Sequence, residues 1–140
     1  MVSLVELPQL DLPFASIRQG RGALVALAVH NGHVIRPEIL PYVALEELAR
    51  FREEDPYTGL WATCAETYVV GQRSRFEVDL NRPREAAVYQ SPQAAWGLNV
   101  WLHPLPEELV LRSLALYDAF YHRLESILAE LLKRHARIVV

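Results

Sequence analysis

Residues able to bind an acidic small molecule are concentrated in one short stretch of the chain. Residues 75–80 alternate long polar and apolar side chains, and Asn81 and Arg82 follow directly before Pro83. The alternation predicts a strand, and the proline ends it, so Asn81 and Arg82 are expected where the strand leaves the sheet. A guanidinium group binds a carboxylate through two parallel hydrogen bonds. Arg82, Asn81 and Arg75 are therefore candidate carboxylate ligands, with a solvated edge strand carrying unrelated charges as the alternative.

A second candidate lies after the most apolar run of the chain. Residues 23–29 are apolar throughout, which is typical of a strand covered on both faces. His30 and His33 follow in a polar loop, and the ligands of α/β proteins gather at the carboxyl ends of such strands. Imidazole is a frequent metal ligand and general base. His30 is thus a candidate metal or catalytic residue, a structural role being the alternative, and Gly32 is expected to let a ligand approach the backbone.

Three consecutive carboxylates form the third candidate. Residues 53–55 read Glu-Glu-Asp at the end of a predicted helix over residues 44–53, which Pro56 prevents from continuing. The helix dipole disfavours each negative charge there by about a few tenths of a kcal/mol. Arg50 and Arg52 could compensate this charge at the surface, or a divalent cation could bind it, and the spacing leaves both possibilities open.

The remaining elements follow from apolar periodicity. Residues 67–70 and 75–80 predict a hairpin that turns at Gly71 and Gln72. Pro106 opens a long helix that ends near the basic residues 133–135. The core-facing stripe predicted for this helix is Val110, Leu114, Tyr117, Tyr121, Leu124, Leu128 and Leu131.

The order strand, helix, hairpin, helix, strand predicts the fold class. It favours a single α/β domain over residues 1–140, with a mixed, largely parallel sheet flanked by helices. The chain has 140 residues, 51% of them hydrophobic, which suffices for one core.

Charge and cysteine content limit the class of partner. The chain has 14 basic and 17 acidic residues, which give a net charge of −3, and the two signs are interspersed. This distribution argues against a nucleic-acid surface and a polybasic membrane patch, and favours a small soluble ligand. Cys64 is the only cysteine, and the longest apolar run is too short to cross a bilayer. We therefore predict a cytoplasmic protein.

Three segments together resemble one enzyme family. They are His30 to Gly32, Glu53 to Thr58 and Val78 to Pro83. With them the chain resembles the N-formylglutamate amidohydrolases from about Ala23 to Val140. The resemblance implies a zinc-exopeptidase-like (phosphorylase/hydrolase-like) α/β fold. It also implies hydrolysis of the amide bond of an N-acyl amino acid, such as N-formyl-L-glutamate to formate and glutamate.

The resemblance also implies roles for individual residues. His30 and Asp55 would be zinc ligands, and Glu54 is the next choice as a ligand and the candidate catalytic carboxylate. Asn81 and Arg82 would bind the carboxylate of the substrate.

The chain also departs from the family pattern. Val29 and Asn31 stand where the family commonly has proline and serine around the histidine. A further ligand histidine is expected shortly after a strand that begins Asp-Leu-His, and the matching strand here is Ile138 to Val140, where the sequence ends. We therefore expect an apparently truncated, weakly active or inactive enzyme that self-associates through the open edge of its sheet. The alternative is a module without metal that binds an acidic molecule through Arg75 and Arg82.

Overall fold

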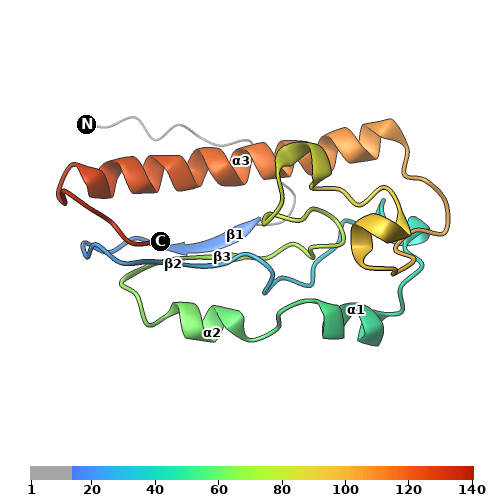
Figure 1. Cartoon of the computed structure of the whole chain (residues 1–140), viewed down its shortest axis with the longest axis horizontal. Helices are drawn as coiled ribbons and strands as arrows, with labels where there is room; N and C mark the ends of the chain where they lie inside the picture. The colour runs from blue at the N-terminus through green and yellow to red at the C-terminus, as the bar shows by residue number, and fades with distance from the viewer. Residues whose placement is uncertain (1–13) are drawn as a thin grey trace.

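A small mixed sheet lies at the centre of the molecule. The computed structural model describes residues 14–140, and its three strands are β1 (Ala15–Arg18), β2 (Val25–Ala28) and β3 (Thr67–Gly71). β3 lies in the middle, antiparallel to β1 and parallel to β2 (Figure 1). The predicted α/β class with a mixed sheet is therefore confirmed.

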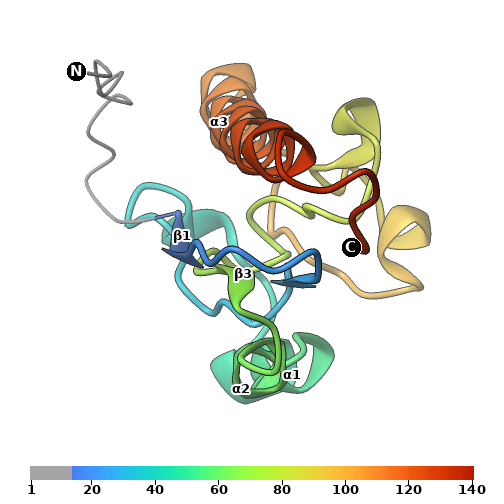
Figure 2. The same cartoon turned by 90° about the vertical axis from the view of Figure 1, so that its left-hand side faces the viewer.

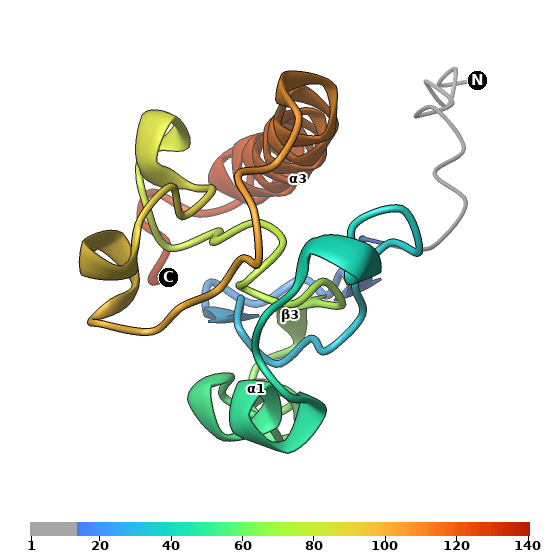
Figure 3. The same ribbon diagram turned by 90° about the vertical axis from the view of Figure 1, so that its right-hand side faces the viewer.

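Helices cover both faces of this sheet. The long helix α3 (Glu107–Leu132) lies on one face, and the short helices α1 (Glu47–Glu53) and α2 (Thr58–Ala62) lie on the other. The three layers are clearest when the molecule is viewed from its two ends (Figures 2 and 3). Among residues 14–140, no helix combines the length and apolar content needed to span a membrane.

The strand predicted over residues 23–29 is confirmed as β2, with both faces covered. Leu27 and Val29 pack toward α3, in the main core with Phe120. Ala28 faces the other layer, where it packs against Ala62 of α2. Side chains that alternate between two covered faces explain why this strand is apolar at every position.

The hairpin predicted after β3 is wrong. After Gly71 the chain leaves the sheet, and residues 75–80 form turns. The carbonyl of Ser74 accepts hydrogen bonds from the backbone N–H groups of Glu77 at 2.9 Å and Val78 at 3.2 Å, which bends the backbone.

The alternation of side chains in residues 75–80 was misleading because its polar members are buried. Glu77 and Asp79 are both 0% exposed. Glu77 pairs with Arg36 at 2.7 Å, and Asp79 pairs with His30 at 2.6 Å. Buried ion pairs in a turn therefore produce the same pattern as a strand with one solvated face.

The buried face of α3 is rotated slightly from the predicted stripe. Leu124 and Leu131 are buried as predicted, whereas Tyr117, Tyr121 and Leu128 lie at the border of the core. The tyrosines occupy the border because their hydroxyl groups donate to backbone carbonyls, Tyr117 to Arg82 at 2.8 Å and Tyr121 to Leu80 at 2.6 Å. The fully buried residues of this helix are Ser113, Leu116, Phe120, Leu124, Ile127 and Leu131.

The last residues of the chain lie beside β2. Val139 forms a parallel bridge with Leu24, with backbone hydrogen bonds of 2.8 and 2.9 Å to Val25 and Ala23. The segment predicted as a strand over residues 138–140 therefore makes a single bridge.

The segment between β3 and α3 folds over one end of the sheet. It contains the 3-10 helices η2 (Arg84–Ala86) and η3 (Pro92–Ala95), and η1 (Leu40–Tyr42) precedes α1. Phe76 and Tyr89 form a second core here, beside the turn of residues 75–80.

Candidate functional site

His30 and Asp55 lie together at the carboxyl end of β2, as predicted. The Nδ1 atom of His30 is 3.2 Å from Oδ2 of Asp55, and the backbone N–H of Asp55 donates to the carbonyl of His30 at 3.1 Å. His30 is buried, whereas the side chain of Asp55 is 55% exposed. The pair thus combines a fixed imidazole with a carboxylate open to solvent.

The second nitrogen of His30 contacts a residue that sequence reasoning missed. Nε2 lies 2.6 Å from Oδ1 of Asp79, whose carboxylate is fully buried. An ionised carboxylate only accepts hydrogen bonds, so Asp79 favours the imidazole tautomer that carries its proton on Nε2 and donates it in a hydrogen bond to Oδ1. Nδ1, which lies beside Asp55, then carries a lone pair that can bind a metal ion.

Asp79 divides its two oxygens between two sides of the site. Oδ1 accepts from His30 and, at 2.8 Å, from the backbone N–H of Asn81. Oδ2 accepts from the hydroxyl of Tyr89 and, at 3.1 Å, from Arg75. Burial alone would raise the pKa of Asp79, but the hydrogen bonds from His30 and Tyr89 outweigh it and keep the pKa well below its ordinary value. The carboxylate is therefore ionised at neutral pH.

Arg82 and Arg75 both lie beside Asp79. The Nε atom of Arg82 is 3.7 Å from Oδ2 of Asp79, and its guanidinium lies over the ring of Tyr89. Arg75 is more constrained, because its Nε donates to the Tyr89 hydroxyl at 3.2 Å while one terminal nitrogen donates to Asp79. The Arg82 side chain is also the more exposed of the two, at 31% against 16% for Arg75.

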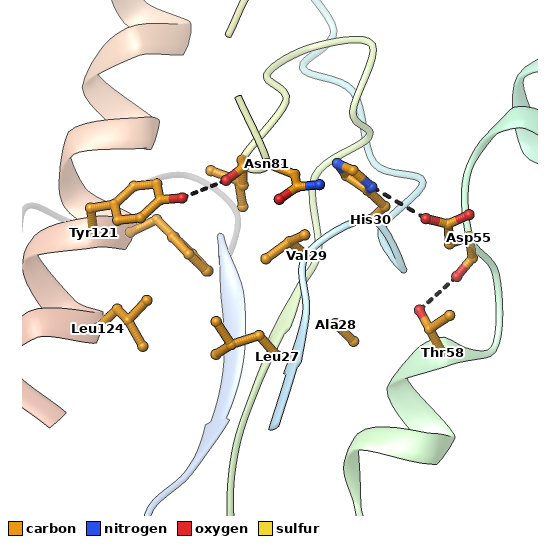
Figure 4. Close-up of a pocket in the computed structure, with 11 residues that line it drawn as sticks. Leu27, Ala28, Val29, His30, Asp55, Thr58, Asn81, Tyr121 and Leu124 are labelled. Carbon is orange, nitrogen blue, oxygen red and sulfur yellow. Dashed lines mark hydrogen bonds and ion pairs between the residues drawn. The ribbon is translucent and has the colours of Figure 1, made fainter. Parts of the chain in front are cut away.

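A pocket of about 360 Å³ connects the predicted residues. His30, Asp55 and Asn81 line its rim, and apolar side chains from β2 and α3, including Leu27 and Leu124, line the rest (Figure 4). The predicted metal-binding residues and one predicted carboxylate ligand thus share one opening.

Glu54 lies in a separate buried cluster. One of its carboxylate oxygens accepts from Ser74 and from Arg50, the latter at 3.1 Å, and the other pairs with His33. Arg50 also donates to the backbone carbonyl of His33 at 2.7 Å. The structure therefore brings Glu54 together with His33 and not with His30 and Asp55.

The three carboxylates at the acidic end of α1 have different partners. Arg50 pairs with Glu54, His30 pairs with Asp55, and the indole N–H of Trp96 donates to Glu53 at 3.1 Å. Compensation by an arginine is thus confirmed for Glu54, and binding of a divalent cation by the exposed Asp55 stays a prediction.

Gly32 makes a close approach to the protein's own backbone. A Cβ atom at this position would lie 2.2 Å from the carbonyl carbon of Gln72 and 2.6 Å from the nitrogen of Arg73. The expectation that a ligand approaches Gly32 is therefore wrong. The glycine lets the histidine loop pack against the segment that leaves β3.

His30 and Asp55 are suited to fill two of the four ligand positions around a tetrahedral zinc ion. Two ligands on a tetrahedral zinc ion with bonds of about 2.0 to 2.2 Å lie about 3.3 to 3.6 Å apart, and Nδ1 of His30 and Oδ2 of Asp55 are 3.2 Å apart. The contact of Nε2 with Asp79 is also typical of a metal-binding histidine. Within residues 14–140, no group of three His, Cys, Asp or Glu side chains is arranged to bind one ion.

A comparison with models of protein families gives the family of this chain. The family model described as N-formylglutamate amidohydrolase matches residues 22–140. The chain belongs to the N-formylglutamate amidohydrolase family. No curated protein and no solved structure matches the chain. The matched residues include the pocket rim and both arginines.

Two residues of this candidate site were missed for different reasons. Asp79 lies inside the segment that suggested the family, but the alternation predicted only a strand there and gave Asp79 no role of its own. Tyr89 lies in an irregular segment, where no period or spacing distinguishes it from a core tyrosine. Only the folded chain brings its hydroxyl to Asp79.

Proposed function

We propose that this protein is a metal-dependent hydrolase that cleaves the amide bond of an N-acyl amino acid. The proposal rests on the position of His30, whose two ring nitrogens contact the exposed carboxylate of Asp55 and the buried carboxylate of Asp79. Membership of the amidohydrolase family supports the reaction class. We infer zinc as the metal, N-formyl-L-glutamate as the substrate and a zinc-exopeptidase-like arrangement of the fold.

His30 and Asp55 are the proposed metal ligands. When bound, zinc lowers the pKa of a water molecule to about 7 and polarises the carbonyl group of the scissile amide. Asp79 keeps the proton of His30 on Nε2, so that Nδ1 presents a lone pair. Because Asp55 is largely exposed, its carboxylate can exchange the contact with His30 for a ligand without disrupting the core.

Arg82 and Asn81 are the proposed ligands of the substrate carboxylate. Asn81 is exposed at the pocket rim, and the Arg82 side chain, 31% exposed, is fixed over Tyr89. A carboxylate bound there is kept beside His30 and Asp55, which orients the acyl group toward the proposed metal. Arg75 extends the positive charge of this side of the site.

A non-catalytic module that binds acidic molecules is the second candidate. It is favoured by the observation that, in the part of the chain that the structure describes, two and not three potential ligands converge. Bound metal separates the two functions, because the module needs none.

The test combines zinc titration with a hydrolysis assay on N-formyl-L-glutamate. We expect the protein to bind one zinc ion per chain and Asp55→Asn to lose it. Glu46→Gln, an exposed carboxylate at the start of α1, is the matched control. Release of formate that depends on added zinc supports the hydrolase. Binding of glutamate without any zinc binding would instead establish the module.

A further inference from the structure

Tyr89 is a buried residue that contacts both Asp79, behind His30, and the arginines of the site, and the proposed function gives it no role. It is 1% exposed and belongs to the segment between η2 and η3. Its hydroxyl donates to Oδ2 of Asp79 and accepts from Nε of Arg75 at 3.2 Å. Both hydrogen-bonding functions of the hydroxyl are thus used within the site.

The ring of Tyr89 makes a separate set of contacts. The guanidinium carbon of Arg82 lies 4.8 Å from the ring centroid, a distance at which the cation is attracted to the aromatic face. Trp96 packs edge to face against the same ring at 5.8 Å, and Arg75 lies 4.8 Å from the ring of Trp96. Hydroxyl and ring therefore contact different members of the site.

We propose that Tyr89 is a positioning residue that links the histidine side of the site to its arginine side. The hydroxyl fixes the rotamer of Asp79, whose other oxygen orients His30, and the ring fixes the guanidinium of Arg82. The proposal rests on the function proposed above, since it assigns His30 to a metal and Arg82 to a carboxylate.

The position of Asp79 explains why the hydroxyl matters. Rotation of this carboxylate would move Oδ1 away from His30. The Tyr89 hydroxyl holds the other oxygen, Oδ2, in place with a short hydrogen bond. Arg75 at 3.1 Å and Arg82 at 3.7 Å contact the same oxygen over longer distances. Burial, followed by the hydrogen bond to Asp79, raises the pKa of Tyr89 to about 12, so the hydroxyl retains its proton at neutral pH. It therefore remains a donor throughout the ordinary pH range.

The ring restricts an otherwise mobile side chain. Ordering a free arginine side chain on binding costs conformational entropy. Stacking on Tyr89 orders Arg82 before a ligand arrives, so less of this entropy is lost when a carboxylate binds.

Two variants separate the hydroxyl from the ring. Tyr89→Phe removes only the hydroxyl, so we expect zinc affinity, measured by competition with a chromophoric chelator, to fall about tenfold. Affinity for glutamate, measured by calorimetry, should change less than twofold. Tyr89→Leu also removes the ring. We expect this variant to lose zinc affinity as Tyr89→Phe does and, in addition, to bind glutamate at least fivefold more weakly than the wild type.

A double-mutant cycle distinguishes positioning from general destabilisation. If Tyr89 acts on the metal through Asp79, Tyr89→Phe should have almost no further effect on zinc affinity in an Asp79→Asn background. A purely structural role would lower affinity equally in both backgrounds. Tyr68→Phe in β3 is the matched control, and it should bind zinc and glutamate as the wild type does.

The outcomes separate this inference from the proposed function. A wild type that binds zinc, with a Tyr89→Phe variant of equal affinity, overturns the linkage and leaves the function in place. Equal losses in the wild-type and Asp79→Asn backgrounds overturn the linkage as well. A wild type that binds no zinc overturns the proposed function and the linkage with it. The Tyr89→Phe arm decides the question even if Tyr89→Leu fails to fold.

Discussion

Asp55, Asp79 and Glu54 lie in different surroundings, and these surroundings determine what each carboxylate can do. Asp55 is exposed next to an imidazole, Asp79 is buried behind that imidazole, and Glu54 is enclosed by Arg50, Ser74 and His33. An exposed carboxylate can bind a ligand, a buried one can orient a histidine, and an enclosed one stabilises the fold. Residue type alone does not distinguish these three roles.

Arg82 should be sensitive to replacement by lysine. Arg82→Lys keeps the positive charge but loses the planar fork and its stacking on Tyr89. Because charged hydrogen bonds contribute about 1.5 to 3 kcal/mol, we expect affinity for glutamate, measured by calorimetry, to fall at least tenfold.

Zinc content serves as the control for Arg82→Lys. The substituted side chain contacts neither His30 nor Asp55, so bound zinc should be unchanged. Glutamate affinity equal to that of the wild type would contradict the assignment of Arg82 as a carboxylate ligand.

At the scale of single elements, α1 is anchored by Glu54 at its carboxyl end. Glu54→Gln leaves Arg50 buried without its ionic partner, and breaking a buried ion pair of this kind costs about 3 to 5 kcal/mol. We expect a loss of about 3 kcal/mol in the free energy of unfolding in urea, with zinc affinity within twofold of the wild type. A folded variant of normal stability that loses catalysis would instead identify Glu54 as the catalytic carboxylate.

The orientation of α3 can be tested by two alanine substitutions one residue apart. Ile127 is 1% exposed, whereas Leu128 is half-buried at the border of the core. Ile127→Ala should cost about 2 to 5 kcal/mol in urea unfolding, and Leu128→Ala less than half as much. The reverse order would restore the stripe predicted from the sequence.

The elements most visible in the sequence are those made of apolar residues. β2 and α3 follow from a continuous apolar run and from helical periodicity, and both are confirmed. The bend after Gly71 could not be predicted, because it depends on ion pairs between residues distant in the chain, such as Arg36 with Glu77. His30 and the acidic run of residues 53–55 were candidates from their places after a strand and a helix. The family resemblance selected Asp55 within that run, and the structure brings His30 and Asp55 together.

At the scale of the whole molecule, Arg36 connects three separate parts of the chain. From the loop after β2 it pairs with Glu77 at 2.7 Å, and it donates to the Ser113 hydroxyl at 2.8 Å and the Leu109 carbonyl at 3.2 Å in α3. These contacts run from the turn of residues 75–80 to the long helix. Arg36 therefore fixes the helix layer relative to the segment that carries Asp79.

Arg36→Ala should destabilise the protein in a pH-dependent way. It leaves Glu77 with one remaining cationic neighbour, Arg73 at 3.7 Å, and we expect a loss of about 3 kcal/mol in the free energy of unfolding at pH 7. Burial already raises the pKa of Glu77 above 4.5, against the opposing effect of Arg36. Removing Arg36 raises this pKa further.

The sign of the pH effect follows from that shift. A carboxyl group with a raised pKa binds its proton more tightly in the folded protein, so acidification relieves the cost of burying its charge. The loss caused by Arg36→Ala should therefore shrink as the pH falls from 7 toward 4.5 in urea unfolding. Arg112→Ala, an exposed arginine of α3, should cost less than about 1 kcal/mol at every pH. A loss independent of pH would show that packing, and not the charge of Glu77, is what Arg36 provides.

The two-sided carboxylate of Asp79 limits how this protein can evolve. Because one oxygen serves His30 and the other serves Tyr89 and Arg75, a change on either side alters the partner of the opposite side. Replacement of His30 leaves the buried carboxylate of Asp79 without one of its hydrogen-bond donors. Replacement of Tyr89 removes the hydroxyl that orients Asp79 and, through it, His30. We therefore expect positions 30, 79 and 89 to be retained or lost together among descendants of a common ancestor. Trp96, which contacts the ring of Tyr89 and Arg75, should vary more freely.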